Sequence, residues 1–245
     1  MKKYLFVIPA RLKSKRLPNK PIKLIKGLPM IVRTFLQCNK VIKKKNIVIA
    51  TDSNKIVNVC KKYDIPSMLT TAKCLTGTDR VAEIAKKIKS QIYINLQGDE
   101  PIFPPEDIKK FLKQALKYKK NILNAYCNVS SRNHFLDVNI PKLLFDKNEN
   151  LIYMSRASIP GNKKKKFYKA WRQVCIYSFP RNKLLLFNKM RSKTELEKIE
   201  DIEILRFIEN GEKIKMVKLS NKSMSVDNKE DLKKVSLKIK KIDKT

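Results

Sequence analysis

Residues 4–20 read YLFVIPARLKSKRLPNK, a short apolar run that leads directly into a basic segment. An apolar run of this length, bounded by proline and charge, is typical of a buried strand. Residues 29–41 then place apolar side chains at helical spacing, residues 46–51 form a second apolar run, and residues 53–63 return to helical spacing. Strands that alternate with helices in this way indicate an α/β fold whose strands are mainly parallel.

The same alternation continues to the end of the chain. We predict further strands at 66–70, 93–97, 121–129, 171–179 and 213–219, and further helices at 78–89, 104–118, 181–190, 196–210 and from 229 onward. Residues 142–159 read as paired strands around a turn at 146–150, and GNKKKK at 161–166 reads as a mobile loop. No repeat or linker divides the chain. The sequence therefore predicts one domain over residues 1–245, with a single doubly wound, mostly parallel sheet and a small antiparallel strand insertion.

The charge of the chain is strongly basic, with 56 Lys and Arg against 22 Asp and Glu and a formal net charge of +34. Such a charge suits a nucleic-acid partner, but it also suits a chain that uses lysine everywhere. The lysines run from Lys2 to Lys244, without a separate basic tail, a zinc-finger spacing or an aromatic RNA-binding motif. We therefore expect no nucleic-acid partner, and we expect the positive field to attract small anionic substrates.

The cysteines and the hydropathy pattern bear on the compartment. An odd number of scattered cysteines without a CxxC pair argues against a disulfide framework and a zinc site, and fits a reducing compartment. They are Cys38, Cys60, Cys74, Cys127 and Cys175. No apolar run approaches the roughly 20 residues that a membrane span needs. We expect a cytoplasmic protein without membrane insertion.

Several common chemistries are excluded by counting residues. The chain has 5 glycines, and neither GxGxxG nor GxxxxGK[ST] occurs, so it lacks the dinucleotide fingerprint and the Walker loop. The only histidine is His134, in the polar stretch SSRNHF, where we expect a surface position. Histidine-based metal sites are therefore excluded, and a serine or cysteine triad has no favourable candidate. The remaining possibility is charge-based chemistry on phosphates.

A basic loop follows the first predicted strand. Because open α/β sheets bind ligands at the carboxyl ends of their strands, its arginines and lysines are candidate phosphate ligands. They are Arg11, Lys13, Lys15, Arg16 and Lys20. The alternative is an exposed basic loop without a ligand.

Two aspartates follow apolar strands and are candidate metal ligands. Asp99 lies in NLQGDEP after the strand at 93–97, and Asp227 ends SMSVD. Mg²⁺ prefers carboxylate oxygens together with substrate phosphates, so Asp99 would hold the metal while Arg16 and Lys20 hold the phosphates. The alternative for each aspartate is a helix N-cap, and Asp227 before NKEDL suits that role well.

The ordered motifs are similar to those of the bacterial CMP-Kdo synthetases, which are cytidylyltransferases for 3-deoxy-manno-octulosonate (Kdo) in lipopolysaccharide or capsule synthesis. These motifs are IPARLKSKRLPNKPI, KGLPMI, IVIATD, LTGTDRVAE, INLQGDEP, YMSRASIP and SVDNKEDLKKV. The resemblance runs from Tyr4 to about Val235 and implies a fold like that of nucleotide-diphospho-sugar transferases. The opening motif and QGDEP are shared in looser form with sialic-acid cytidylyltransferases, and YMSRASIP is more specific to the Kdo branch.

The resemblance implies a role for each matching residue. Ala10, Arg11, Arg16 and Lys20 match the loop around the CTP phosphates. Gly77, Thr78, Arg80 and Gln97 match the pocket around cytosine and ribose. Asp99 and Asp227 match the magnesium ligands, and Arg156, Tyr177 and Glu203 match the sugar pocket. The catalytic set is then Arg16, Lys20, Asp99 and Asp227.

The implied reaction is attack of the C2 hydroxyl of the sugar on the α-phosphorus of CTP, with pyrophosphate as the leaving group. Its requirements are CTP, an acidic 3-deoxy-ulosonate sugar and Mg²⁺. Catalysis would be alignment plus neutralisation of charge. The resemblance also implies a homodimer, formed through a segment near residues 140–190 that includes part of the sugar pocket.

The chain departs from the family pattern in the segments that the resemblance assigns to the sugar pocket. Gln173-Val174-Cys175 stands where many members carry His-Leu-Gly, and Ile204 stands where they carry glutamine. The segment 138–142 also differs. A lost hydrogen-bonding group can change sugar selectivity by orders of magnitude. An 8-amino-Kdo or sialic-like substrate therefore stays open, as does a non-catalytic nucleic-acid-binding protein.

Overall fold

A computed structural model describes residues 1–14, 16–164 and 166–242 of the chain. Its central sheet has the strand order β11-β7-β10-β6-β1-β4-β5, and every neighbouring pair on this path is parallel except the two that β10 makes. The strands are β1 (Lys2–Ala10), β4 (Ile47–Thr51), β5 (Ser67–Leu69), β6 (Ser90–Leu96), β7 (Ile122–Asn128), β10 (Trp171–Pro180) and β11 (Ile214–Lys218). The mostly parallel sheet that the sequence predicts is therefore confirmed.

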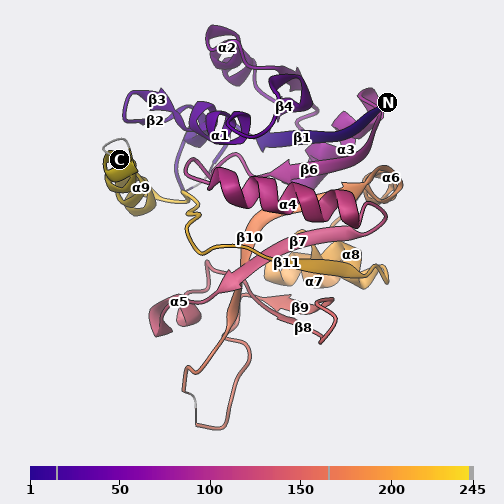
Figure 1. Ribbon diagram of the computed structural model, residues 1–245, viewed down its shortest axis with the longest axis vertical. Coiled ribbons are helices and arrows are strands. Elements are labelled where there is room, and N and C mark those ends of the chain that lie inside the picture. The colour runs from indigo at the N-terminus through magenta and orange to yellow at the C-terminus, as the bar shows by residue number, and fades with distance from the viewer. Residues whose placement is uncertain (15, 165, 243–245) are drawn as a thin grey trace.

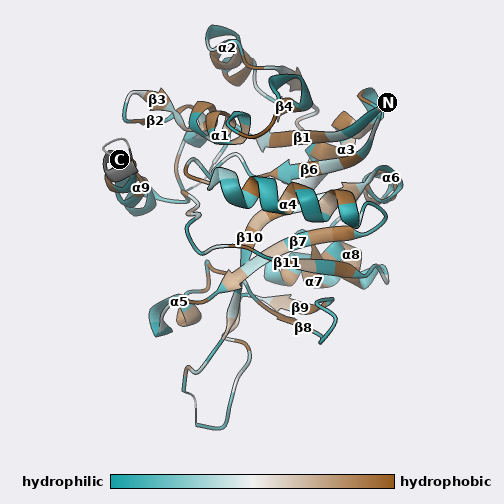
Figure 2. Ribbon diagram, in the orientation of Figure 1, coloured by the Kyte–Doolittle hydropathy of each residue, from teal (hydrophilic) through white to brown (hydrophobic). Residues whose placement is uncertain are grey.

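Helices cover both faces of this sheet (Figure 1). One face packs against α1 (Met30–Asn39), α2 (Asn54–Lys62) and α4 (Pro105–Lys117), and the other against α3 (Gly77–Lys87), α6 (Arg181–Lys189), α7 (Glu195–Glu200) and α8 (Leu205–Glu209). Alternate side chains of β1 serve the two cores: Phe6 and Ile8 lie in the first, and Leu5 and Val7 lie in the second. The outer side of α4 is predominantly hydrophilic (Figure 2). The doubly wound arrangement is confirmed.

The remaining elements lie at the margins of the sheet. They are η1 (Lys20–Ile22), β2 (Leu24–Ile25), β3 (Leu28–Pro29), η2 (Lys44–Asn46), α5 (Arg132–Leu136), β8 (Lys142–Phe145), β9 (Leu151–Ser155) and α9 (Lys229–Ile242). The pair β8–β9 is the predicted antiparallel insertion, and β8 joins it to β10. Figure 1 shows this pair at the opposite end of the molecule from α2.

The structure divides the helix predicted at 196–210 into α7 and α8. Asp201 adopts a left-handed conformation with φ of 48° and ends α7. Arg156 supplies the reason, because its guanidinium donates to the carbonyl oxygens of Glu200 at 2.5 Å and Asp201 at 3.1 Å. A tertiary partner thus satisfies carbonyls that a continuous helix would use itself.

A third, small core joins segments that are distant in sequence. Buried side chains from the basic loop, β2, the start of α1, the turn after β6, the SMSVD stretch and α9 pack together. They are Leu17, Ile25, Met30, Ile102, Val226, Val235 and Ile239. The loop after β1 and the segment before α9 are thereby held beside the end of β6. Within the described ranges, none of the helices has the length and apolar character to cross a membrane.

Candidate active site

Three parallel strands, β6, β1 and β4, end at the same edge of the sheet. Ala10 at the end of β1 pairs with Thr51 at the end of β4, and Val7 pairs with Asn95 near the end of β6. The basic loop, Asp52 and the QGDEP turn therefore begin side by side. This is the edge at which open α/β sheets bind ligands.

The turn after β6 is held tightly. A Cβ on Gly98 would lie 2.6 Å from the carbonyl oxygen of Pro9, so any larger residue here would push β1 and the turn apart. Thr34, in α1, donates its hydroxyl to the carbonyl of Gly98 at 3.0 Å. Val226 N–H donates to the carbonyl of Asp99 at 3.0 Å, which places the SMSVD segment against the turn. The structure thus places Asp99 and Asp227 next to each other.

Lys20 lies between these two aspartates. Its Nζ is 2.6 Å from Oδ2 of Asp99 and 3.1 Å from Oδ1 of Asp227. Only 15% of the Lys20 side chain is exposed, against 27% for Asp99 and 26% for Asp227. Burial alone would lower the pKa of Lys20, but the two carboxylates outweigh it and the pKa is raised. Lys20 is therefore a fixed cation between two partly accessible acids.

Arg16 extends this charged group toward solvent. Its guanidinium lies 3.1 Å from Oδ1 of Asp227 and donates to Oδ1 of Asn139 at 3.2 Å, and 57% of its side chain is exposed. Arg11 and Lys13 are also exposed, whereas Lys15, like Lys165 of the predicted GNKKKK loop, lies outside the described residues. Several cations at this edge are therefore accessible to a polyanion.

The two aspartates fit a magnesium ion. Their oxygens already converge on one cation, the ammonium of Lys20. The described part of the chain has no group of three or more His, Cys, Asp or Glu that would form an all-protein site. One or two carboxylates completed by substrate phosphates and water is the usual arrangement for Mg²⁺.

The N-cap alternative is not what the structure shows for either aspartate. Asn228 accepts from the backbone N–H of Asp231 at 2.9 Å at the start of α9, while Asp227 faces Lys20. The N-cap of α4 is Pro104 rather than Asp99.

The start of α3 forms the second part of the site. Thr76 and Asp79 form a capping box, in which the Thr76 N–H donates to Asp79 at 2.7 Å. The carboxylate of Glu203 accepts from the N–H of Thr78 at 3.0 Å and from Nε2 of Gln97 at 3.1 Å. The structure thus brings Gly77, Thr78, Gln97 and Glu203 together.

Arg80 and Ala10 are buried at the same edge. Arg80 is 3% exposed, and its guanidinium donates to Asp52 at 2.6 Å and to the hydroxyl of Thr70 at 2.7 Å. Ala10 is 5% exposed at the end of β1. Arg80 therefore ties the ends of β4 and β5 to α3, a partner set that its motif did not reveal.

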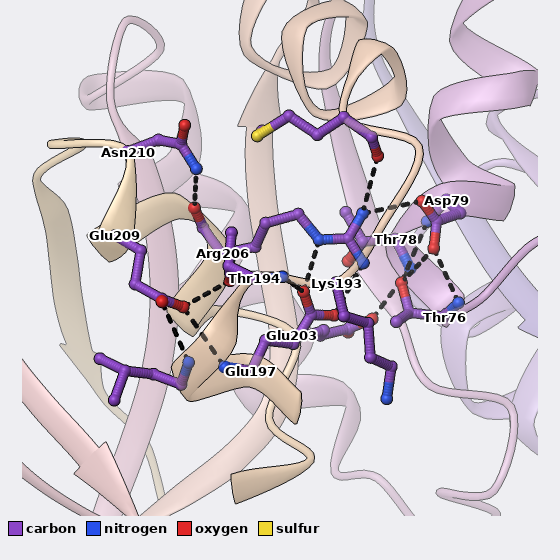
Figure 3. A network of polar contacts seen from close by, with 12 residues as sticks. Thr76, Thr78, Asp79, Lys193, Thr194, Glu197, Glu203, Arg206, Glu209 and Asn210 are labelled. Atoms are coloured by element: carbon purple, nitrogen blue, oxygen red, sulfur yellow. Dashed lines mark hydrogen bonds and ion pairs between the residues drawn. The ribbon is translucent and has the colours of Figure 1, made fainter. Parts of the chain in front are cut away.

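A buried ion network anchors α8 to this region (Figure 3). Arg206 is fully buried, donates to both oxygens of Glu197 at 2.6 and 2.7 Å, and reaches Asp79 at 3.2 Å. The guanidinium also lies 3.9 Å from the ring centroid of Phe187. Because Asp79 caps α3, the same arginine fixes the helix start and the segment that carries Glu203.

The resemblance implies that Arg156 and Tyr177 belong to the sugar pocket. Arg156 donates to three backbone carbonyls, including that of Val138 at 3.0 Å, so at most two of the five N–H groups of an arginine are left for a ligand. Tyr177 is 3% exposed, and its hydroxyl accepts from Gln173 at 3.0 Å. Burial, followed by the charge of Glu203, raises the pKa of Tyr177.

Glu100 is a candidate functional residue that the sequence reasoning missed. It is 3% exposed, and its Oε2 has no hydrogen-bond partner among the described residues. Burial, followed by the charge of Asp99, raises its pKa to about 8. Its place next to Asp99 in QGDEP was the available signal.

His134 is exposed on α5, as expected, and accordingly takes no part in the site. All 5 cysteines are free thiols in the structure.

Comparison with known proteins gives consistent results. The cytidylyltransferase family profile matches residues 5–214. The 3-deoxy-manno-octulosonate cytidylyltransferase of Chloroherpeton thalassium is 35% identical over 95% of this chain and 96% of its own length. That of Francisella tularensis is 37% identical over 94% and 95%.

A solved structure is similar over nearly the whole fold. It is a CMP:2-keto-3-deoxy-manno-octonic acid synthetase complexed with CTP, with a TM-score of 0.89, 27% identity, and coverage of 98% of this chain and 99% of that chain. The sequence, the fold and the clustered motifs agree, and the chain belongs to the 3-deoxy-manno-octulosonate cytidylyltransferase (CMP-Kdo synthetase) family.

Proposed function

We propose that this enzyme transfers CMP from CTP to the C2 hydroxyl of Kdo and releases pyrophosphate, for lipopolysaccharide or capsule synthesis. The observation that carries the proposal is the placement of Lys20 between Asp99 and Asp227, beside the exposed Arg16, at the ligand-binding edge of the sheet. This set supplies cations for a triphosphate and carboxylates for a divalent metal in one place.

The proposed mechanism relies on charge and alignment. Lys20 and Arg16 neutralise the negative charge that grows on the phosphates as pyrophosphate leaves, and Arg11 adds to the positive edge. When bound by Asp99 and Asp227, magnesium would neutralise phosphate oxygens and favour loss of the proton from the attacking hydroxyl. The part of the site that binds the nucleotide is formed by Ala10, Gly77, Thr78, Arg80 and Gln97.

We propose Arg156, Tyr177 and Glu203 for the sugar half. The free N–H groups of Arg156 suit the carboxylate of a sugar acid. The side-chain amide of Gln173 donates from Nε2 to Oδ1 of Asn124 at 3.1 Å and to the hydroxyl of Tyr177 at 3.0 Å. Both N–H groups of this amide are used, so its carbonyl oxygen Oε1 is the group available to a sugar. An acceptor there favours a sugar that offers a hydroxyl or an amine, and 8-amino-Kdo is therefore the second candidate.

A substrate panel tests the reaction. Pyrophosphate release is measured with CTP and Mg²⁺ and with Kdo, 8-amino-Kdo or neuraminic acid as the acceptor. We expect the highest kcat/KM with Kdo. Release without any sugar dependence, or none with any of the three, would contradict the proposal.

Substitution of Asp227 tests the metal role. For Asp227→Asn we expect kcat to fall about 10²–10³-fold at saturating CTP and Mg²⁺, because a charged ligand is lost. Unchanged turnover would remove Asp227 from the mechanism. Asp231→Asn is the matched control, since Asp231 instead accepts from the backbone N–H groups of Asp227 and Asn228 at the start of α9.

We also propose a cytoplasmic homodimer whose interface includes the β8–β9 pair within residues 140–190. Ile152 on β9 is 57% exposed, and among the described residues β9 itself pairs only with β8, although Asn150, just before it, bridges Lys215 of β11. An exposed apolar side chain on such an edge strand suits an interface between subunits.

A further inference from the structure

Each carboxylate oxygen of Glu203 accepts one hydrogen bond inside the protein, and its second lone pair stays available to the sugar proposed above. Oε2 accepts from the backbone N–H of Thr78 at 3.0 Å, and Oε1 accepts from Nε2 of Gln97 at 3.1 Å. Burial raises the pKa of Glu203, and the hydrogen bond from the N–H of Thr78 opposes that shift. In its ionised form the carboxylate has no hydrogen to donate, so the amide of Gln97 turns its NH₂ group toward Glu203. The orientation of this amide therefore follows from the chemistry of its partner.

The surroundings hold Gln97 against the start of α3. A Cβ on Gly77 would lie 2.9 Å from Nε2 and 3.2 Å from Oε1 of Gln97, so the amide packs directly on the glycine backbone. The main chain of Gln97 is fixed as well, because its N–H donates to Cys175 at 3.3 Å and its carbonyl accepts from Glu100 at 3.3 Å. The side chain has little room to move away from Glu203.

Glu203 is itself held by the buried ion network. The backbone N–H of Arg206 donates to the carbonyl of Glu203 at 3.3 Å, and the guanidinium of Arg206 reaches both Glu197 and the capping residue Asp79 (Figure 3). The residue that accepts and the helix start that supplies Thr78 are therefore fixed by one arginine.

We propose that Glu203 is a positioning residue that locks the Gln97 amide so that its carbonyl oxygen meets the bound nucleotide. This proposal rests on the proposed function. Oε1 of Gln97 has no hydrogen-bond partner in the described part of the chain, and the residue lies two positions before Asp99 in the same turn. An acceptor at this place selects a nucleotide group that donates a hydrogen bond: the amino group of cytosine or a hydroxyl of ribose.

A wrong nucleotide leaves this acceptor unpaired. Uracil carries a carbonyl where cytosine carries its amino group, and a deoxyribose lacks one hydroxyl. An acceptor that the bound nucleotide encloses and leaves without a donor costs a factor of about ten or more in binding. An amide that is free to rotate can bind either a donor or an acceptor. Held by Glu203, the Gln97 amide can bind only a donor.

The variant Glu203→Gln tests the lock. Thr78 N–H still requires an acceptor, so the carbonyl of the new amide stays there and its NH₂ faces Gln97. The Gln97 amide must then reverse and present NH₂ to the nucleotide. Isothermal titration with CTP, UTP and 2′-deoxy-CTP, with Mg²⁺ and without sugar, measures the result. We expect the preference of the parent protein for CTP over one of the two analogues to fall about tenfold.

The two analogues separate the two sources of the donor. Loss of the CTP-to-UTP ratio assigns the donor to the cytosine amino group, and loss of the CTP-to-deoxy-CTP ratio assigns it to the ribose. Binding of tripolyphosphate reports the general effect of removing a negative charge, which changes every affinity but neither ratio.

The swapped pair Gln97→Glu with Glu203→Gln provides the rescue. The amide now at position 203 donates to the carboxylate now at position 97, and the second oxygen of that carboxylate restores an acceptor toward the nucleotide. We expect the lost ratio to return to within about threefold of the parent, a recovery that a purely structural role for Glu203 would not produce. If Glu203→Gln does not fold, Gln97→Met removes the acceptor with Glu203 intact and is expected to show the same loss.

Unchanged ratios in Glu203→Gln and Gln97→Met overturn the inference, as does a swapped pair that stays as unselective as the single variant. A parent protein that does not bind CTP contradicts the proposed function instead. The two failures are therefore distinguishable.

Discussion

At the scale of single residues, Lys20 is the cation on which the charged groups of the site converge. Replacement by methionine keeps most of the buried stem but removes the ammonium between Asp99 and Asp227. We expect Lys20→Met to lower kcat/KM for pyrophosphate release about 10²–10³-fold, because a fixed charge at the phosphates is lost. Lys23→Met is the matched control, since Lys23 is exposed in the same segment, and it should stay within about twofold of the parent.

The second prediction at this scale concerns Cys74. Burial, followed by a hydrogen bond to Glu83, raises the pKa of its thiol to about 12. Only a thiolate reacts with iodoacetamide, so at pH 8 the reaction at Cys74 should be about 10³-fold slower than at a solvent-exposed cysteine with an ordinary pKa. Glu83→Gln removes the carboxylate and should accelerate it, while Cys60, whose pKa is raised to about 11 without Glu83, stays unchanged. Equal rates at Cys74 in both proteins, read by mass spectrometry, would contradict this account.

The sequence carried different amounts of information about different residues. The proximity of Lys20, Asp99 and Asp227 was predictable, because each follows an apolar strand or stretch and the motifs occur in the order typical of the family. The partners of Arg80 and Arg206 were not predictable, since Asp52 is 28 residues from Arg80 and Asp79 is 127 residues from Arg206. Pairing of buried charges at such separations is decided by the fold, which periodicity does not encode.

At the scale of elements, Arg206 joins α7, α8 and α3. Arg206→Met would leave Glu197, which is fully buried, without its cation. We expect the free energy of unfolding to fall by about 3–5 kcal/mol, measured by urea denaturation. The double variant Arg206→Met with Glu197→Leu removes both charges and should recover most of that loss. Lys198→Met on the exposed side of α7 is the control; a loss of equal size there would contradict the account.

The long, periodic elements were predicted well and the short ones were not. The central strands and the helices α1 to α4 follow the apolar pattern closely, because the strands pack in a core on both faces and each helix packs on one. The hairpin β2–β3 and α5 are too short to show a period. The break between α7 and α8 depends on Arg156, which lies 44 residues before Glu200.

At the scale of the whole molecule, the proposed interface can be tested by charge insertion. Ile152→Asp places a carboxylate on the exposed side of β9, and its desolvation would oppose association. We expect sedimentation equilibrium to report a dimer for the parent and a monomer for this variant. Leu116→Asp on α4, at a partly exposed apolar position on another surface, should leave the dimer intact. A parent protein that sediments as a monomer would refute the proposal.

The hydrogen bond between Val226 and Asp99 joins two segments that are synthesised at different times. Lys20 and Asp99 emerge before Asp227, which lies 207 residues after Lys20. A nascent chain can therefore complete most of its sheet while it still lacks one of the two acids. Under the mechanism proposed above, cytidyl transfer would begin only after the segment that carries Asp227 has docked, so a chain interrupted before Asp227 would not consume CTP.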